Sequence, residues 1–321
     1  MNRLLVGLCL CLLILHAWGG PQRFRIVTYN VENLFDTLHA EGKEDGEFTP
    51  TGSRQWTSGR YWGKLGKLCR VIAAVGGDTP ADLVALVEVE NDSVMHDLTQ
   101  RTKLRRLGYD YAMAGTADVR GIGVGLLYQP HRFRPVSKDT LRFEGLHKRL
   151  RPTRHALHVA GELVTGDTLD VLVCHWPSRR GGQEATKFRK GVAQQLRTYC
   201  DSLLRVRSRA ALVLMGDLNA WYPETCLREG LGCTLPEGSP NPRELYLLSH
   251  ARQASHDITG TYKYQGRWNQ LDHFIVNGRL LPSHTHRTTP WTDSAHCYIA
   301  DLPFLLQKEP RSGAMRPYRT Y

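Results

Sequence analysis

Short apolar runs that end in polar side chains recur along this chain. The clearest run, 210–215 (AALVLM), is followed by Gly216, Asp217, Leu218 and Asn219. Six apolar residues without alternation are typical of a strand buried on both faces, so we expect Asp217 at its carboxyl end. Asp217 and Asn219 are two residues apart and therefore project to one side, where they offer an acceptor and an amide to a metal-bound water or a phosphate. The alternative is an Asx turn that merely ends the strand.

The same reading extends over the rest of the chain. Apolar or alternating runs predict strands, and apolar residues at helical spacing predict amphipathic helices. Segments 36–59 and 222–256 are rich in turn residues and are expected to be loops. The predicted strands are 24–31, 82–89, 121–129, 133–143, 155–164, 168–175, 210–217 and two pieces within 260–277, and the predicted helices are 60–75, 91–107 and 187–206, the basic face of the last being solvated.

Polar residues at other strand ends are candidates for the same chemistry. Asn30 closes the first strand, and Glu88 lies inside the apolar end of 82–89. A carboxylate in such a run is costly unless it is paired or binds a cation, so a metal ligand is our preferred interpretation and a salt bridge the alternative. His175 follows a strand and precedes an Arg-Arg-Gly-Gly turn, where it is placed to meet an anion, although a lone histidine is more often structural.

Two further residues are weaker candidates. The basic segment 147–154 (HKRLRPTR) is explained by a solvated loop, but its last residue, Arg154, directly precedes a predicted strand and is a candidate phosphate contact. Asp272 stands at the start of an apolar segment, DHFIVNG, which is a second costly place for a carboxylate.

Residues 1–19 predict a cleaved signal peptide, because the apolar run after Arg3 is shorter than the roughly 20 residues that span a bilayer. We therefore expect a secreted or periplasmic protein with no transmembrane segment in the mature chain. The net charge is +11, and removing Arg3 leaves +10, which favours an anionic partner such as nucleic acid, phospholipid or a smaller phosphate ester.

Six cysteines follow the predicted signal peptide, and none has the paired spacing of a structural zinc site. In an oxidising compartment Cys226 and Cys233 are one of several possible disulfide pairs.

Six strand-end motifs stand in order over residues 24–278: YNVENLFD, ALVEVEND, RGIGVGLLY, VLVCHWPSR, LMGDLNA and QLDHFIVNG. Together they resemble the endonuclease/exonuclease/phosphatase superfamily, in particular secreted members from Bacteroides-like bacteria. The resemblance implies one α/β domain over 20–321, a four-layer α/β/β/α sandwich of two mixed sheets flanked by helices. It also implies metal-dependent hydrolysis of a phosphodiester or phosphomonoester.

The resemblance also implies roles for the candidate residues. Glu88 and Asn30 match the ligands of the divalent cation, and Asp217 matches the aspartate that positions or deprotonates the attacking water. Oxygen ligands suit Mg²⁺, Mn²⁺ or Ca²⁺ rather than zinc. Asn219 matches the asparagine that binds the scissile phosphate. His175 resembles the histidine that donates to the phosphate or leaving group, and Arg154 matches, less securely, an arginine that contacts phosphate.

One family motif has no match. Members end with a strand carrying Ser-Asp-His, whose histidine contacts the phosphate and is oriented by an upstream aspartate. Asp272 matches that aspartate, but neither Ser294-Ala295-His296 nor Ala300-Asp301-Leu302-Pro303 completes the motif. We therefore expect that the chain lacks its C-terminal Ser-Asp-His strand and is impaired as an enzyme.

The resulting prediction is a secreted, cation-dependent phosphoesterase, with a nuclease acting on DNA or RNA as the leading form. A phospholipid or inositol-phosphate phosphoesterase of the same fold is the alternative, because the catalytic residues act on the phosphate and not on the group attached to it. A catalytically impaired binding protein is the alternative of a different class.

Overall fold

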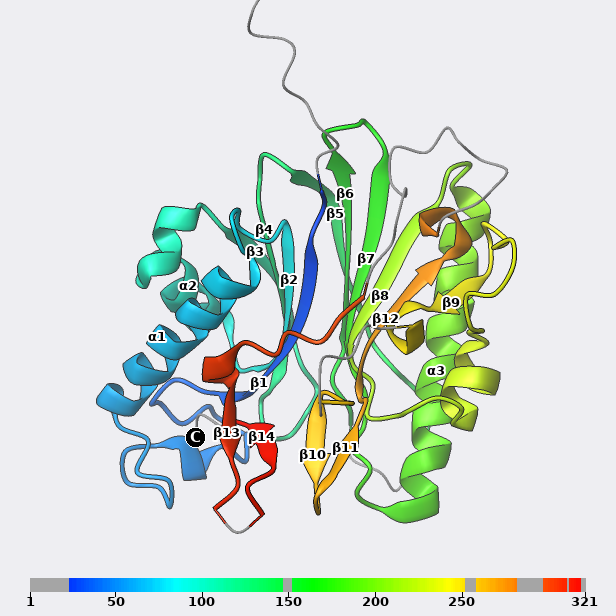
Figure 1. Ribbon diagram of the computed structural model, residues 1–321. Coiled ribbons are helices and arrows are strands. Elements are labelled where there is room, and N and C mark those ends of the chain that lie inside the picture. The colour runs from blue at the N-terminus through cyan, green and yellow to red at the C-terminus, as the bar shows by residue number, and fades with distance from the viewer. Residues whose placement is uncertain (1–22, 147–151, 252–257, 282–296, 311, 319–321) are drawn as a thin grey trace, which may run out of the picture.

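Two β-sheets lie face to face between helices in the computed structural model of the protein (Figure 1). The structure describes residues 23–146, 152–251, 258–281, 297–310 and 312–318. The predicted signal peptide, 1–19, and the segment Ser294-Ala295-His296 lie outside the described residues. Within the described part, no helix combines the length and the apolar character needed to cross a bilayer.

The first sheet has four strands in the order β1-β2-β4-β3, with β1 parallel to β2 and the other pairs antiparallel. On the side away from the second sheet it is covered by helices α1 and α2, which stand on the left of Figure 1. The elements are β1 (Ile26–Leu34), β2 (Leu83–Val89), β3 (Asp110–Ala114), β4 (Gly123–Tyr128), α1 (Ser58–Val75) and α2 (Asp92–Gln100), with short 3-10 helices at Gly46–Phe48 and Lys103–Leu107.

The second sheet has six strands in the order β5-β6-β7-β8-β12-β9. Only β7 and β8 run parallel, so this sheet is also mixed. Helix α3 (Gly182–Val206) and a π-helix (Cys226–Leu231) cover its outer face. The strands are β5 (Phe133–Leu141), β6 (Ala156–Leu163), β7 (Thr168–His175), β8 (Ala211–Asp217), β9 (Leu245–Leu247) and β12 (Asp272–Asn277), and two small hairpins pair β10 (Tyr262–Tyr264) with β11 (Arg267–Asn269) and β13 (Leu306–Lys308) with β14 (Met315–Pro317). Further 3-10 turns lie at Leu248–Ala251, Gly278–Leu280 and Pro303–Leu305.

Side-chain alternation along the strands builds three apolar layers. In β8, Val213 and Met215 face the first sheet, whereas Leu212 and Leu214 face α3. One apolar layer fills the space between the sheets, a second lies under α1 and α2, and a third lies under α3. Burial of both faces explains why this strand reads as a continuous apolar run. The predicted four-layer sandwich is therefore confirmed.

Several predicted boundaries were wrong for identifiable reasons. The predicted helix 91–107 is split: α2 ends at Gln100, and the Thr102 hydroxyl accepts from the Leu104 N–H at 3.1 Å to start a 3-10 turn. Helix α3 begins at Gly182 rather than at 187. Its first turn is polar and carries no apolar stripe, so the pattern of apolar residues did not predict that turn. Arg189 on that helix, expected to be solvated, is 1% exposed.

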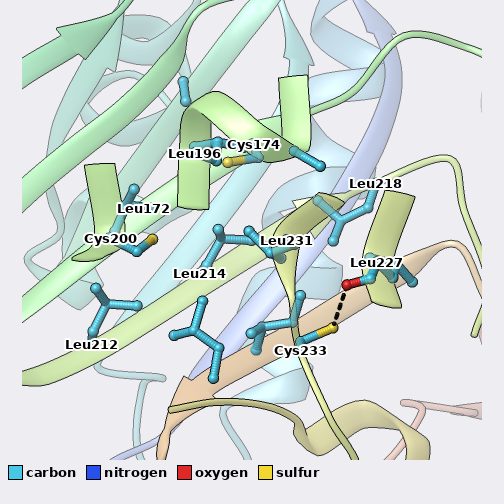
Figure 2. Packing of buried hydrophobic residues seen from close by; sticks show 14 of the residues in the cluster. Leu172, Cys174, Leu196, Cys200, Leu212, Leu214, Leu218, Leu227, Leu231 and Cys233 are labelled. Carbon is cyan, nitrogen blue, oxygen red and sulfur yellow. Dashed lines mark hydrogen bonds between the residues drawn. The ribbon is translucent and has the colours of Figure 1, made fainter. Parts of the chain in front are cut away.

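The loop segments contain more structure than we expected. Phe48 and Trp56, in the predicted surface loop 36–59, pack with Phe35 in the layer under α1. Within 222–256, the π-helix packs its leucines beneath α3, as Figure 2 shows for Leu227 and Leu231. Cys226 and Cys233 are buried free thiols here, and the Cys233 thiol donates to the Leu227 carbonyl at 3.3 Å (Figure 2).

Candidate active site

The strand ends of the second sheet bring three candidate residues to one place. Parallel pairing of β7 with β8 sets His175 opposite Asp217, and antiparallel pairing of β12 with β8 sets Asp272 opposite Asp217. Val173, Met215 and Phe274 contact the layer between the sheets. Side chains two positions away on the same strand project to the same side, which applies to His175 and Asp217 after Val173 and Met215 and to Asp272 before Phe274. His175, Asp217 and Asp272 therefore lie at the rim of the inter-sheet space.

Glu88 reaches the same rim because strand β2 changes its alternation there. Val87 faces the second sheet, so a regular strand would turn Glu88 toward the helices. Instead the register shifts between Val87 and Val89, Glu88 adopts φ +67°, and Val89 packs under α1 and α2. Such a φ is a strained conformation for a residue with a side chain and is most often kept where function needs it. The bulge delivers the carboxylate to the facing sheet.

Asn30, in the middle of β1 and directly before its register shift against β2, joins the two sheets. Its Nδ2 donates to Asp217 Oδ2 at 3.0 Å and lies 3.5 Å from Glu88 Oε1. Its Oδ1 accepts the Glu32 N–H at 2.9 Å, which fixes the orientation of the amide and leaves one lone pair of that oxygen. Asn30 thus contacts both the candidate metal ligand Glu88 and the candidate base Asp217.

A turn behind the site supports Glu88. The Asn33 N–H donates to Glu88 Oε2 at 2.9 Å, with Asn33 at φ +59°. Lys64 of α1 is 2% exposed, and its ammonium donates to the Glu32 carbonyl of the same turn. Burial lowers the pKa of Lys64 to about 8. The lysine therefore holds the turn from the side of the helices.

Asn219 forms the Asx turn that we treated as an alternative. Its N–H donates to Asp217 Oδ1 at 2.9 Å, its Nδ2 donates to the Trp176 carbonyl at 3.1 Å, and its φ is +49°. The turn holds Asp217 in place and still leaves the Asn219 side chain among the residues that line the cleft. The turn and the functional interpretation are therefore compatible.

His175 and Arg154 complete the group. His175 is 4% exposed, and its Nε2 lies 3.9 Å from Glu88 Oε1. Burial, then the nearby Arg154 and Arg120, lower the pKa of His175 well below the ordinary histidine value, so the imidazole is neutral at pH 7. Arg154, expected in a basic loop, is 6% exposed and forms an isolated β-bridge with Thr116. All seven sequence-predicted residues line one cleft of about 2300 Å³.

Negative charge is concentrated in this site. Burial, followed by repulsion from Asp272, raises the pKa of Asp217 to about 8, and burial with repulsion from Glu88 also raises the pKa of Asp272. No three His, Cys, Asp or Glu side chains of the described residues are placed to hold a metal by themselves. Two carboxylates that share one amide, with a third nearby, nevertheless fit a hard cation that takes oxygen ligands, because a cation relieves their repulsion.

This charge predicts a pH dependence of stability in the cation-free protein. The pKa of the Asp217 carboxyl is about 8 when folded and about 3.8 when unfolded, so its unfavourable ionisation grows as pH rises between those values. With EDTA, we expect the free energy of unfolding to fall between pH 5 and pH 8 by on the order of 2 to 5 kcal/mol more in wild type than in Asp217→Asn. Urea denaturation at both pH values measures this. Equal pH dependence of the two proteins would contradict it.

Sequence reasoning missed two residues beside Arg154. Asp118, in the loop between β3 and β4, is 7% exposed, and its Oδ2 lies 3.1 Å from Arg154 Nε. Arg120 lies on the same loop with its Nε 3.4 Å from Asp118 Oδ1. Arg120 belonged to a quoted motif, RGIGVGLLY, but nothing in the residue pattern linked that loop to a segment more than 30 residues later.

Comparison with known proteins agrees with this architecture. No curated protein matched the chain. Solved structures with similar folds include an endonuclease/exonuclease/phosphatase family protein from Bacteroides thetaiotaomicron (TM-score 0.54, 16% identity, 79% of this chain and 82% of that chain). Others are a mannosyl-6-phosphatase from the same species (0.52, 15%, 79% and 85%) and a humanized D. rerio TDP2 (0.51, 17%, 79% and 83%). At these identities the likeness shows the fold.

The family itself is shown by sequence. The model described as "Endonuclease/Exonuclease/phosphatase family" matches residues 25–321. That span contains both sheets and all seven candidate residues. The protein therefore belongs to the endonuclease/exonuclease/phosphatase family.

Proposed function

We propose that this protein is a divalent-cation-dependent phosphoesterase and, more specifically, a nuclease that cleaves phosphodiester bonds. The observation that carries the proposal is the contact of Asn30 with both Glu88 and Asp217, which joins carboxylates from two sheets at one cleft. Family membership supports the general reaction class. The finer assignment rests on the chemistry of these side chains.

Glu88 and Asn30 would hold Mg²⁺, for which Mn²⁺ or Ca²⁺ could substitute. When bound, the cation would neutralise charge on the phosphoryl oxygens. Asp217 lies against Asn30 and would orient the attacking water and take its proton. Its Oδ1 is held by the Asn219 N–H, which fixes the direction of the carboxylate.

Other donors that line the cleft would hold the phosphate. We assign this role to the Asn219 amide and the Arg154 guanidinium, because preorganised donors stabilise charge that develops in the transition state. A neutral His175 would donate one hydrogen bond to the phosphate or leaving group. Its Nδ1 is buried and has no hydrogen-bond partner among the described residues.

The preference for a polynucleotide comes from charge. The sequence carries +11, and the arginines that line the cleft include Arg120, Arg154, Arg179 and Arg180. The net positive charge of the whole chain attracts a polyanion more strongly than a single phosphate group. Secretion to the periplasm or exterior, with removal of 1–19, is part of the proposal. N-terminal sequencing of the exported protein should begin at Gly20.

The test measures whether the full chain hydrolyses each member of a substrate panel in Mg²⁺ and in EDTA. The panel contains duplex DNA, RNA, a chromogenic phosphodiester, sphingomyelin, an inositol phosphate and mannose 6-phosphate. We expect cleavage of DNA or RNA that requires the cation. Cleavage confined to a lipid, inositol or sugar phosphate would keep the phosphoesterase assignment and overturn the nuclease assignment. Hydrolysis that is unchanged by EDTA would overturn the cation dependence.

A catalytically impaired binding protein is the second candidate, and one observation favours it. Asp272 Oδ1 is buried and has no hydrogen-bond partner among the described residues. Appending a Ser-Asp-His strand should raise turnover if the motif is what the site lacks. Binding of nucleic acid without cleavage by either form would favour the binding protein.

A further inference from the structure

A buried carboxylate, Asp118, is fixed beside the cleft by the loop that joins β3 to β4. Its N–H donates to Thr116 Oγ1 at 3.1 Å, and its carbonyl accepts the Gly121 N–H at 3.0 Å. Gly121 has φ +84°, a conformation that glycine adopts without strain and that closes this turn. These bonds fix the backbone of Asp118 at this place in the loop.

Two guanidinium groups converge on this carboxylate. Arg154 Nε lies 3.1 Å from Oδ2, and Arg120 Nε lies 3.4 Å from Oδ1, which also accepts the Arg120 backbone N–H at 2.9 Å. The Arg154 side chain is 7% exposed, whereas the Arg120 side chain is 39% exposed. Asp118 and both arginines line the same cleft as Asn30, Asp217 and His175. One carboxylate thus serves two cations from separate segments at the site.

The charge balance leaves this group short of one anion. Two guanidinium groups share a single Asp118 carboxylate, and burying a guanidinium without full pairing is unfavourable. Burial lowers the pKa of Arg154, and Asp118, followed by Glu88 and Asp217, opposes this effect, so the guanidinium also feels the charge of the last two carboxylates. A phosphate placed between these carboxylates with their cation and the arginines would supply the missing negative charge.

We propose that Asp118 is a positioning residue that holds Arg154 and Arg120 side by side so that both guanidinium groups bind oxygens of the substrate phosphate. The proposal deepens the proposed function and rests on it for the identity of the substrate. Both arginines form ion pairs with Asp118 on their Nε side. A planar guanidinium carries five N–H donors, so each group can still offer donors in the geometry that suits phosphate. Asp118 itself touches no substrate.

The experiment measures the dissociation constant of inorganic phosphate in Mn²⁺, together with KM and kcat on whichever substrate the panel gives. We expect Asp118→Asn to weaken phosphate binding about tenfold and to raise KM similarly, while kcat changes less than about threefold, since charge-assisted hydrogen bonds have this order of strength. Arg120→Gln, at a partly exposed side chain, should weaken binding about fivefold without affecting folding.

The direction of the Asp118→Asn effect separates two explanations. If Asp118 acted only through its charge, removing a negative charge near the phosphate would tighten binding. In a chain that already carries Arg120→Gln and Arg154→Gln, adding Asp118→Asn should change phosphate affinity by less than about twofold, because the carboxylate acts through those arginines.

Asp82 provides the matched control. It is 6% exposed, pairs with Arg132 Nε at 2.6 Å and accepts the Arg25 N–H at 2.6 Å. It lies six residues before Glu88 along β2, about 20 Å away at roughly 3.3 Å per residue. Asp82→Asn should lower the melting temperature but leave phosphate affinity within about twofold of wild type.

Phosphate affinities of the variants distinguish failure of this inference from failure of the proposed function. Weaker phosphate binding in folded Asp118→Asn, and not in Asp82→Asn, supports the inference even if wild type hydrolyses nothing on the panel, in which case only the proposed function fails. Unchanged or tighter binding in folded Asp118→Asn overturns the inference and leaves the proposed function standing. If Asp118→Asn does not fold, Arg120→Gln provides the test, and a phosphate affinity equal to that of wild type overturns the inference. No measurable phosphate binding by wild type also overturns it.

Discussion

Asp217→Asn is expected to lower kcat/KM by about a thousandfold or more on any substrate that the wild type hydrolyses with Mg²⁺. The amide keeps the shape of the side chain and can still accept the Asn219 N–H, which Asp217 Oδ1 accepts at 2.9 Å. It can neither take a proton from water nor help to balance a divalent cation, and each of these contributions is typically about a hundredfold or more. Steady-state kinetics on the full chain measure the effect.

Asp170 is the control for this substitution. It is also fully buried in the second sheet, but it faces α3, where its Oδ1 contacts His158 Nε2 at 3.0 Å and accepts from Arg207 at 2.9 Å. Asp170→Asn should cost stability and leave kcat/KM within about threefold of wild type. Asp217→Asn should be no less stable than wild type in EDTA, because it removes a carboxyl whose pKa is raised by burial and repulsion. Retention of a tenth of wild-type activity by folded Asp217→Asn would show that Asp217 is not the base.

Gly216→Ala is expected to destabilise the fold by at least about 3 kcal/mol or to prevent folding. Gly216 precedes Asp217 in β8 and has φ +135°, and a Cβ built on it would stand 1.9 Å from the Cys174 carbonyl oxygen. That oxygen belongs to the backbone of β7, so the contact can be relieved only by separating β7 from β8. The substitution would therefore disturb the register that sets His175 opposite Asp217.

Gly63→Ala in α1 is the matched control, since no atom lies within 4 Å of the position of its added Cβ and its φ is not positive. Alanine in an exposed helix position is favourable by about 0.5 to 1 kcal/mol relative to glycine. Urea denaturation of both variants gives the comparison. Equal stability of Gly216→Ala and wild type would mean that β7 and β8 are not as closely paired as the structure has them.

The strands that carry the site could largely be predicted from their residues. β2 and β8 are buried on both faces, and their runs of apolar residues without polar alternation indicate this burial directly. Regular alternation from Met215 also places Asp217 toward the inter-sheet space without any further information. By contrast, β3 has only five residues, too few for a periodic signal, and it was missed.

The geometry of the site depended on features that residue patterns do not contain. Glu88 faces the second sheet only because β2 bulges at φ +67°, and regular alternation predicts the opposite side. The proximity of Asp118 to Arg154 arises because a loop of the first sheet meets a segment before β6 of the second sheet at the isolated bridge between Thr116 and Arg154. Both are tertiary effects, so the motif resemblance identified candidate residues while their contacts required the structure.

The central claim is that Glu88 and Asn30 hold a divalent cation beside the carboxylate of Asp217, and Mn²⁺ binding tests it most directly. Isothermal titration of the wild-type chain should give one Mn²⁺ site that Mg²⁺ displaces. In Glu88→Gln, a folded variant of the same shape, affinity should fall by about a hundredfold, because the strongest oxygen ligand loses its charge. Mn²⁺ binding by Glu88→Gln that equals wild type, or no binding by wild type, would contradict the account.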